Sequence, residues 1–166
     1  MKSPFVRRTG LILSFVLALC IVLAYSAKAM AAPDDSKVYT RITSQELYDI
    51  MKEHGCDVKY DEDEDDVEDD TSLVWRIDGK RTIILFYDGG TALQLYCVYV
   101  DTNVTTEDAN DWNMTHRFSR AYLDDDGDPC LEVDLDLAGG VTRARIKDYL
   151  DTCTVAVYTW KTEYIN

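Results

Sequence analysis

The chain has 166 residues, with 31 aspartates and glutamates against 17 lysines and arginines, so its formal net charge is −14. Such a chain lacks the cations that displace counterions from nucleic acid, which excludes a nucleic-acid-binding protein. A hydrophobic fraction of 46% with only eight glycines also excludes a collagen-like or low-complexity chain. The length suits one folded domain.

Residues 1–31 predict a secretory signal peptide. Lys2, Arg7 and Arg8 form a basic start, and an uncharged apolar run of 14 residues follows. This run is shorter than the roughly 20 residues of a membrane-spanning helix. Ala29-Met30-Ala31 fits a cleavage site, so we expect a periplasmic or secreted protein with no membrane contact after cleavage. An uncleaved N-terminal anchor is the alternative.

Residues 32–41 predict a short linker, and 42–166 predict the folded domain. The domain begins with a helix at 43–54, where Thr43 and Glu46 have the spacing of a capping box. Gly55 then supplies the left-handed residue that ends many helices.

An acidic run at 61–70 follows, with nine carboxylates in ten residues. Like charges at this density favour a solvated loop. The run lacks the ligand spacing and the glycine of an EF-hand loop, so we expect no specific metal site there. Weak cation binding is the alternative.

Three strands come next, at 73–78, 82–87 and 93–100, and turns rich in aspartate and glycine separate them. They predict an antiparallel meander. The second strand is a nearly continuous apolar run, which favours a central strand covered on both faces.

The second half of the chain predicts helix, strand, strand and helix. Thr105 begins a helix, and 117–123 returns to strand before a tight acidic turn at 124–128. The strand at 131–137 alternates strictly between apolar and acidic residues. Thr142 caps a last helix, whose apolar residues keep helical spacing as far as Tyr164. The fold class is therefore α+β, an antiparallel sheet with the order α-β-β-β-α-β-β-α.

Whether the cysteines form disulfides depends on export. After cleavage four cysteines remain, in an oxidising compartment and outside any C-x-x-C pair, and three connectivities are open. Cys56 follows the first helix, and Cys153 lies on the apolar stripe of the last one. If both helices cover one sheet face, these two residues can meet, so we predict a Cys56–Cys153 disulfide. Four buried thiols are the alternative.

Known catalytic motifs are missing from the sequence. It contains no P-loop, no G-x-S-x-G elbow and no H-E-x-x-H helix. The two histidines, His54 and His116, fall on different helices, so a shared metal site is not expected. We therefore expect no enzyme activity, no cofactor and no catalytic residue.

One strand face carries the best candidate site. Glu132, Asp134 and Asp136 point away from the core side of their strand, and Arg120 can face them from the neighbouring strand as a counter-charge. The face is either a solvated ion-pair surface or a surface that receives another protein. Arg76 and Tyr96 complete the set of predicted protein-binding residues.

From about residue 42 to 160 the chain resembles the YbjN family of proposed bacterial sensory transduction regulators. The residues that carry the resemblance are Trp112-Asn113, Arg117-Phe118, Arg120-Ala121-Tyr122, Asp124, Asp126-Gly127-Asp128, Leu131-Glu132, Asp134, Asp136, Gly139-Gly140-Val141-Thr142 and Leu93-Gln94-Leu95-Tyr96. The resemblance implies a fold similar to type III secretion chaperones. It also implies a non-catalytic module that binds proteins or modulates regulation.

Three functions follow as hypotheses. The first is an exported, chaperone-like, protein-binding or regulatory module with an unidentified protein partner, which could be a second copy of the chain. The second is a periplasmic cation-responsive or stress protein that uses its acidic loop. The third is a small hydrolase, which would require a pocket with convergent polar groups.

Overall fold

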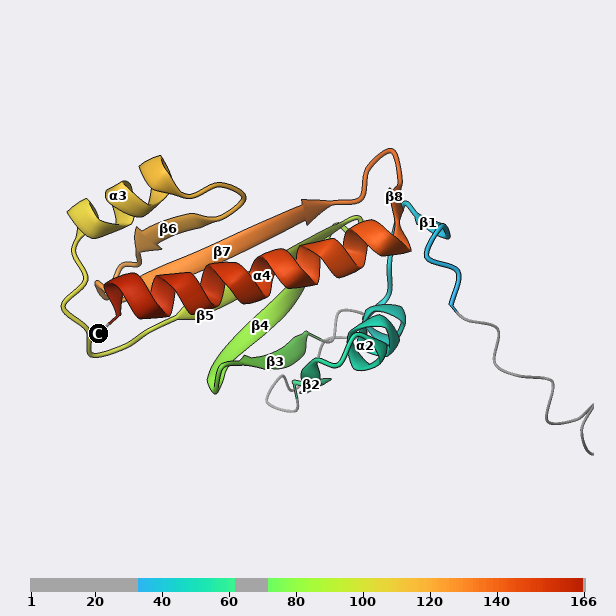
Figure 1. Ribbon diagram of the computed structural model, residues 1–166, viewed down its shortest axis with the longest axis horizontal. Helices are drawn as coiled ribbons and strands as arrows, with labels where there is room; N and C mark the ends of the chain where they lie inside the picture. Colours follow the sequence, from blue (N-terminus) through green and yellow to red (C-terminus); the bar gives the residue numbers. More distant parts are fainter. Residues whose placement is uncertain (1–32, 62–71, 166) are drawn as a thin grey trace, which may run out of the picture. The chain divides into compact units, whose positions relative to one another are not determined.

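The computed structural model describes residues 33–61 and 72–165. The chain divides into two compact units, Met1–Asp34 and Asp35–Asn166, and the second holds the fold (Figure 1). Its elements in chain order are β1 Val38–Tyr39, α2 Ser44–Glu53, β2 Asp57–Tyr60, β3 Leu73–Ile77, β4 Lys80–Tyr87, β5 Ala92–Val98, α3 Thr106–Thr115, β6 Arg120–Leu123, β7 Pro129–Asp136, β8 Val141–Thr142 and α4 Arg143–Tyr164.

The main sheet has six strands in the order β2-β3-β4-β5-β7-β6, and every neighbouring pair is antiparallel. The predicted α+β class and the meander β3-β4-β5 are confirmed. Three short strands were not predicted. β2 pairs with β3, and β1, inside the segment predicted as a linker, pairs with β8. β1 and β8 are distant in sequence, and all three strands are only two to four residues long, so local alternation gives no sign of them.

Three threonines start the three helices. Thr43 and Glu46 form the predicted capping box of α2, and Thr105 and Asp108 form a second one at α3. Thr142 caps α4 by accepting a hydrogen bond from the backbone of Arg145. α4 stays helical through residues 154–159, a stretch rich in β-branched side chains, so the predicted last helix is confirmed. The buried residues of α4 lie on one side of the helix.

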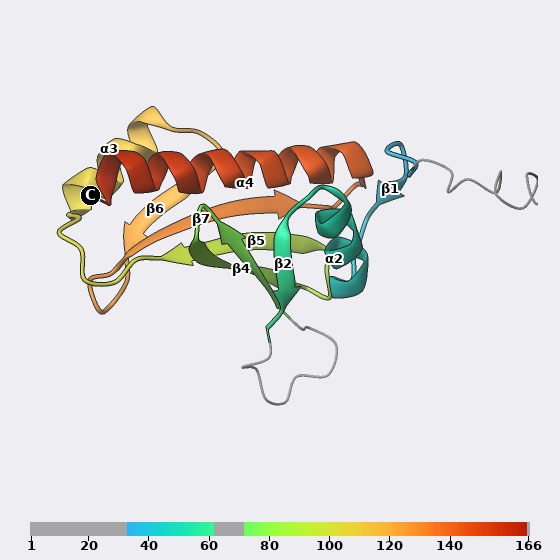
Figure 2. The same ribbon diagram turned by 60° about the horizontal axis from the view of Figure 1, so that its bottom comes forward.

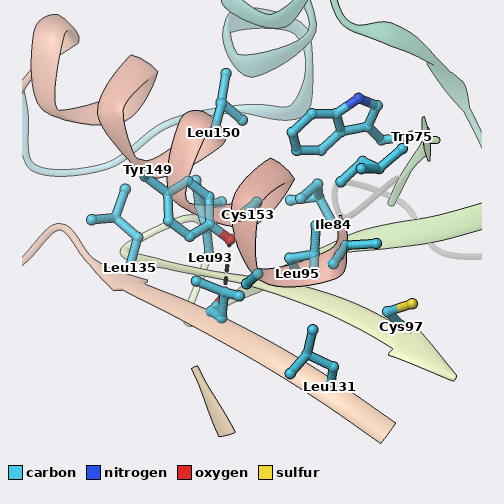
Figure 3. Close-up of a cluster of buried hydrophobic side chains, with 14 of the residues drawn as sticks. Trp75, Ile84, Leu93, Leu95, Cys97, Leu131, Leu135, Tyr149, Leu150 and Cys153 are labelled. Atoms are coloured by element: carbon cyan, nitrogen blue, oxygen red, sulfur yellow. Dashed lines mark hydrogen bonds between the residues drawn. The ribbon is translucent and has the colours of Figure 1, made fainter. Parts of the chain in front are cut away.

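α4 runs along one face of the sheet, and the buried residues of α2 and α3 join the same core (Figures 1 and 2). Alternate residues of β5 and β7, among them Leu93, Leu95 and Leu131, point into this core (Figure 3). The hydroxyl of Tyr149 on α4 donates to the carbonyl oxygen of Val133 at 3.0 Å, so the helix is also tied to β7 by a buried hydrogen bond (Figure 3).

The opposite side of the sheet is not crossed by any helix of the described residues. We call it the open face; from β3 to β6 it carries Val74, Arg76, Arg81, Ile83, Leu85, Tyr87, Gln94, Tyr96, Val98, Cys130, Glu132, Asp134, Asp136, Arg120 and Tyr122. The expectation that β4 is covered on both faces is therefore wrong. Ile83 and Leu85 are only half-buried, because they lie on the open face.

On the edge strand β6, a side chain from α3 forms the hydrogen bonds that a further strand would form at Ala121. The amide of Asn113 on α3 donates to the carbonyl oxygen of Ala121 at 2.8 Å and accepts from the backbone N–H of the same residue at 2.9 Å. β6 begins at Arg120, later than predicted, since Phe118 has a left-handed φ of 69° that interrupts an extended chain.

The predicted Cys56–Cys153 disulfide is not formed. All four cysteines of the described residues are free thiols. Cys153 is fully buried on the core side of α4, whereas Cys56 is only half-buried after α2. Burial raises the pKa of Cys153 and the nearby Cys56 raises it further, but the two sulfur atoms are not bonded.

Candidate binding surface on the open face of the sheet

The open face holds all six residues that the sequence singles out for protein binding. The strand registers place Arg120 opposite Glu132 and Glu132 opposite Tyr96, so these three form one row across β6, β7 and β5. Asp134 lies in the next row, opposite Gln94. Arg76 is not part of this group, because β4 and β5 separate its strand from β7.

Glu132 is the centre of the first row, and it is buried rather than solvated. Its side chain is 6% exposed. Arg120 Nε donates to Glu132 Oε2 at 3.1 Å, Arg120 Nη2 bonds the same oxygen, and the hydroxyl of Tyr122 donates to Oε1 at 2.7 Å. The expectation of a solvated row of three carboxylates is therefore wrong at this position, since neighbouring strands supply partners that replace water.

A second cluster lies beside Glu132. The hydroxyl of Tyr96 is 3.2 Å from Cys130 Sγ, and this thiol donates to Asp124 Oδ2 at 3.8 Å. Burial raises the pKa of Tyr96, and its hydrogen bond to Cys130 raises it further. Burial also raises the pKa of Cys130. Both groups therefore stay neutral near pH 7 and act as packing and hydrogen-bonding groups.

A chain of hydrogen bonds crosses the other end of the face. Tyr87 donates to Gln94 Oε1 at 3.1 Å, and Gln94 Nε2 donates to Asp134 Oδ1 at 2.8 Å. Asp136 accepts from the backbone N–H of Ala138 at 2.7 Å. Both carboxylates are exposed, so the acidic character of the face comes from these two residues.

Sequence reasoning missed Gln94, Tyr87 and Tyr122 as members of the face. The parity of β5 could have found Gln94, because it alternates with Leu93 and Leu95 on the core side. Tyr122 lies two residues after Arg120, so the same alternation places it beside Glu132. Tyr87 has no such signal, since the apolar run of β4 hides which of its residues face outward.

The His, Cys, Asp and Glu side chains of the described residues are spread over the fold rather than gathered in one cluster. Among residues 33–61 and 72–165 no three His, Cys, Asp or Glu side chains converge as metal ligands. Asp61, the first residue of the acidic run, is buried and accepts two hydrogen bonds from Arg81, while 62–70 lie outside the described residues. Burial raises the pKa of Cys56 and of Cys97 to about 11, so these thiols are protonated at neutral pH.

This geometry assigns the protein to the class of α+β domains. One face of its sheet packs under the long helix α4, and no described helix covers the other face. Residues 43–161 match the model of the YbjN family, described as "Putative bacterial sensory transduction regulator". The chain belongs to the YbjN family. No curated protein and no solved structure matches it, so the likeness to type III secretion chaperones stays a prediction.

The described helices give no candidate for a membrane span, because none of them is both long and apolar enough.

Proposed function

We propose that this chain is an exported, non-enzymatic regulatory module that binds a partner protein on the open face of its sheet. One observation carries the proposal. The face presents aromatic and acidic side chains that already hold one another by hydrogen bonds, and no described helix covers it. Side chains fixed in this way lose little conformational entropy when a partner binds.

The chemistry of the end of the face that carries Asp134 and Asp136 favours a partner with basic side chains. Asp134 and Asp136 are exposed, and the whole chain has a formal charge of −14, which attracts a basic surface over long range. Tyr87 is 45% exposed beside them and offers an aromatic contact of the kind enriched in interfaces. A regulatory role is supported by the family description.

Export is supported by the basic start, the apolar run and the cleavage site within residues 1–31. The cation-responsive alternative depends on residues 62–70, which lie outside the described residues, and it stays a prediction. A hydrolase has no supporting observation among the described side chains.

A pair of matched charge reversals tests the binding face. Asp134→Lys changes the open face, and Asp148→Lys makes the same change on the outer side of α4. Both aspartates are exposed, and each accepts one side-chain hydrogen bond, from Gln94 and Arg145 respectively. We expect affinity capture from the exported fraction to lose its bound protein with Asp134→Lys and to keep it with Asp148→Lys.

Equal capture by wild type and both variants would contradict the proposal, provided that thermal unfolding shows all three to be folded. If the occupant is a second copy of the chain, sedimentation of the purified protein should show a dimer that Asp134→Lys dissociates.

A further inference from the structure

A cavity of about 320 Å³ lies between the end of α3, the segment 116–119 and the middle of α4. We call it the α3–α4 pocket; its walls include Trp112, Arg117, Phe118, Asp151, Val155 and Ala156. The volume is at the lower end of the range for small-molecule sites, about 300–1,000 Å³. The pocket is lined by α4, which packs on the core side of the sheet, so it is separate from the open face.

The walls of the pocket offer apolar contact. Trp112 is fully buried, and its indole N–H already donates to Ser119 Oγ at 3.1 Å. The ring of His116 stacks on Trp112 with ring centres 3.7 Å apart. Val155 lies across from them on α4 and is 64% exposed. A molecule that enters the pocket therefore meets aromatic and aliphatic surface rather than unsatisfied donors.

Phe118 at the mouth of the pocket has two unfavourable features. Its φ of 69° is left-handed, which a bulky residue rarely adopts, and its side chain is 70% exposed. Hydrogen bonds on both sides of it hold this conformation, from Trp112 to Ser119 and from Asn113 to Ala121. Neither feature stabilises the described fold, which points to a contact with another molecule.

The mouth of the pocket carries a positive charge. Arg117 lies over the ring of Phe118, 5.3 Å from its centre, and it forms no ion pair with any described residue. The wall also holds a carboxylate, Asp151, which lies 2.8 Å from His54 Nε2 and is 68% exposed. A free guanidinium beside an apolar cavity matches an anionic group attached to an apolar body.

We propose that the α3–α4 pocket binds a small aromatic anion. The aromatic part packs against His116, Phe118 and Val155, and the carboxylate or sulfonate pairs with Arg117. The aromatic side chains of the wall formed by α3 and residues 116–119 favour a ring system over a flexible chain, because rings lose little conformational freedom on packing. The acidic charge of the whole protein opposes an anion, so binding depends on Arg117 and weakens with salt.

Two probes that share one ring system test the proposal. Anilinonaphthalene sulfonate carries the anion, and N-phenylnaphthylamine lacks it. We expect the full-length protein to bind the sulfonate at one saturable site and more tightly than the neutral probe. Arg117→Gln should weaken the sulfonate about tenfold and leave the neutral probe unchanged, the size expected for one lost charge-assisted hydrogen bond. Arg76→Gln, an exposed arginine on the open face, is the matched control.

Substitutions that fill the pocket or remove part of its wall give a second test of where the probes bind. Val155→Trp should abolish the binding of both probes, and Phe118→Ala, at an exposed residue that the fold does not need, should weaken both. Circular dichroism and thermal unfolding check that each variant is folded. If Arg117→Gln behaves like Arg76→Gln, the anion preference is wrong; if both probes still bind to Phe118→Ala with wild-type affinity, the site lies elsewhere.

Discussion

Glu132 is a carboxylate that the pairing of β6 with β7 removes from water. Arg120, whose side chain is 62% exposed, and Tyr122 together occupy both of its oxygens. A buried carboxylate that loses its partner keeps its desolvation cost, so the cost of breaking this pair exceeds the strength of a surface ion pair. Arg120 is therefore a structural counter-charge, whatever it contacts in a complex.

Substitution of Arg120 should test this role. We expect Arg120→Glu to lower the free energy of unfolding by about 1–3 kcal/mol, because it leaves Glu132 unpaired and adds a second carboxylate. Arg76→Glu is the matched control: Arg76 is exposed on the same face and has no ion pair with a described residue, so its change should stay within about 0.5 kcal/mol. Urea unfolding measures both. Equal stability of the two variants would show that water reaches Glu132.

At the scale of the element, the helices and the Arg120 counter-charge to Glu132 were predictable, and the rest of the polar network was not. Capping boxes and apolar stripes join residues three or four apart, so the beginnings of α2 and α4 could be predicted from the sequence. The alternation of β7 likewise assigns its two faces. Burial of Glu132 could not be predicted, because it depends on side chains from β5 and β6 that only the register brings together. The positive φ of Phe118 has no local signal either.

The cap of α3 gives the clearest pH dependence. Hydrogen bonds from the Thr105 hydroxyl and backbone N–H, at 2.6 and 2.8 Å, hold the pKa of Asp108 below its ordinary value of 3.8. The folded state thus binds this proton less readily than the unfolded state. The stabilisation is complete above pH 3.8 and is lost as the pH falls through the lower, folded-state pKa.

Asp108→Asn removes the negative charge of the Asp108 side chain but keeps its size, so it tests the contribution of the charge to the stability of the cap. We expect the variant to be less stable than wild type at about pH 7 and the difference to shrink as the pH falls below 3.8 and wild type loses the same charge. Thermal unfolding across this range measures the difference. Glu107→Gln removes an exposed carboxylate from the same turn that does not bond the cap, so its effect should be smaller. A constant difference for Asp108→Asn would rule out the charge as its cause.

At the scale of the whole molecule, we expect the state of association to depend on Asn113. Its amide occupies the outward N–H and C=O of Ala121 on the edge strand β6. We expect Asn113→Ala to expose these groups and to make the protein associate at high concentration, measured by sedimentation velocity. Asn110→Ala is the control, because Asn110 lies one turn earlier on α3 and bonds only the sulfur of Met114. If both variants sediment as wild type, Asn113 does not protect the edge.

The Asn113 amide also restricts the architecture that two copies could build. An unpaired edge strand is the usual place where one sheet extends into another, and repeated extension produces fibrils. On β6 the place of the next strand is already taken at Ala121 by a side chain of the same molecule. A dimer with one continuous sheet through β6 would have to displace this amide first. Assembly by stacking of faces or by contacts between helices carries no such penalty, and where the contact is isologous it ends at a dimer.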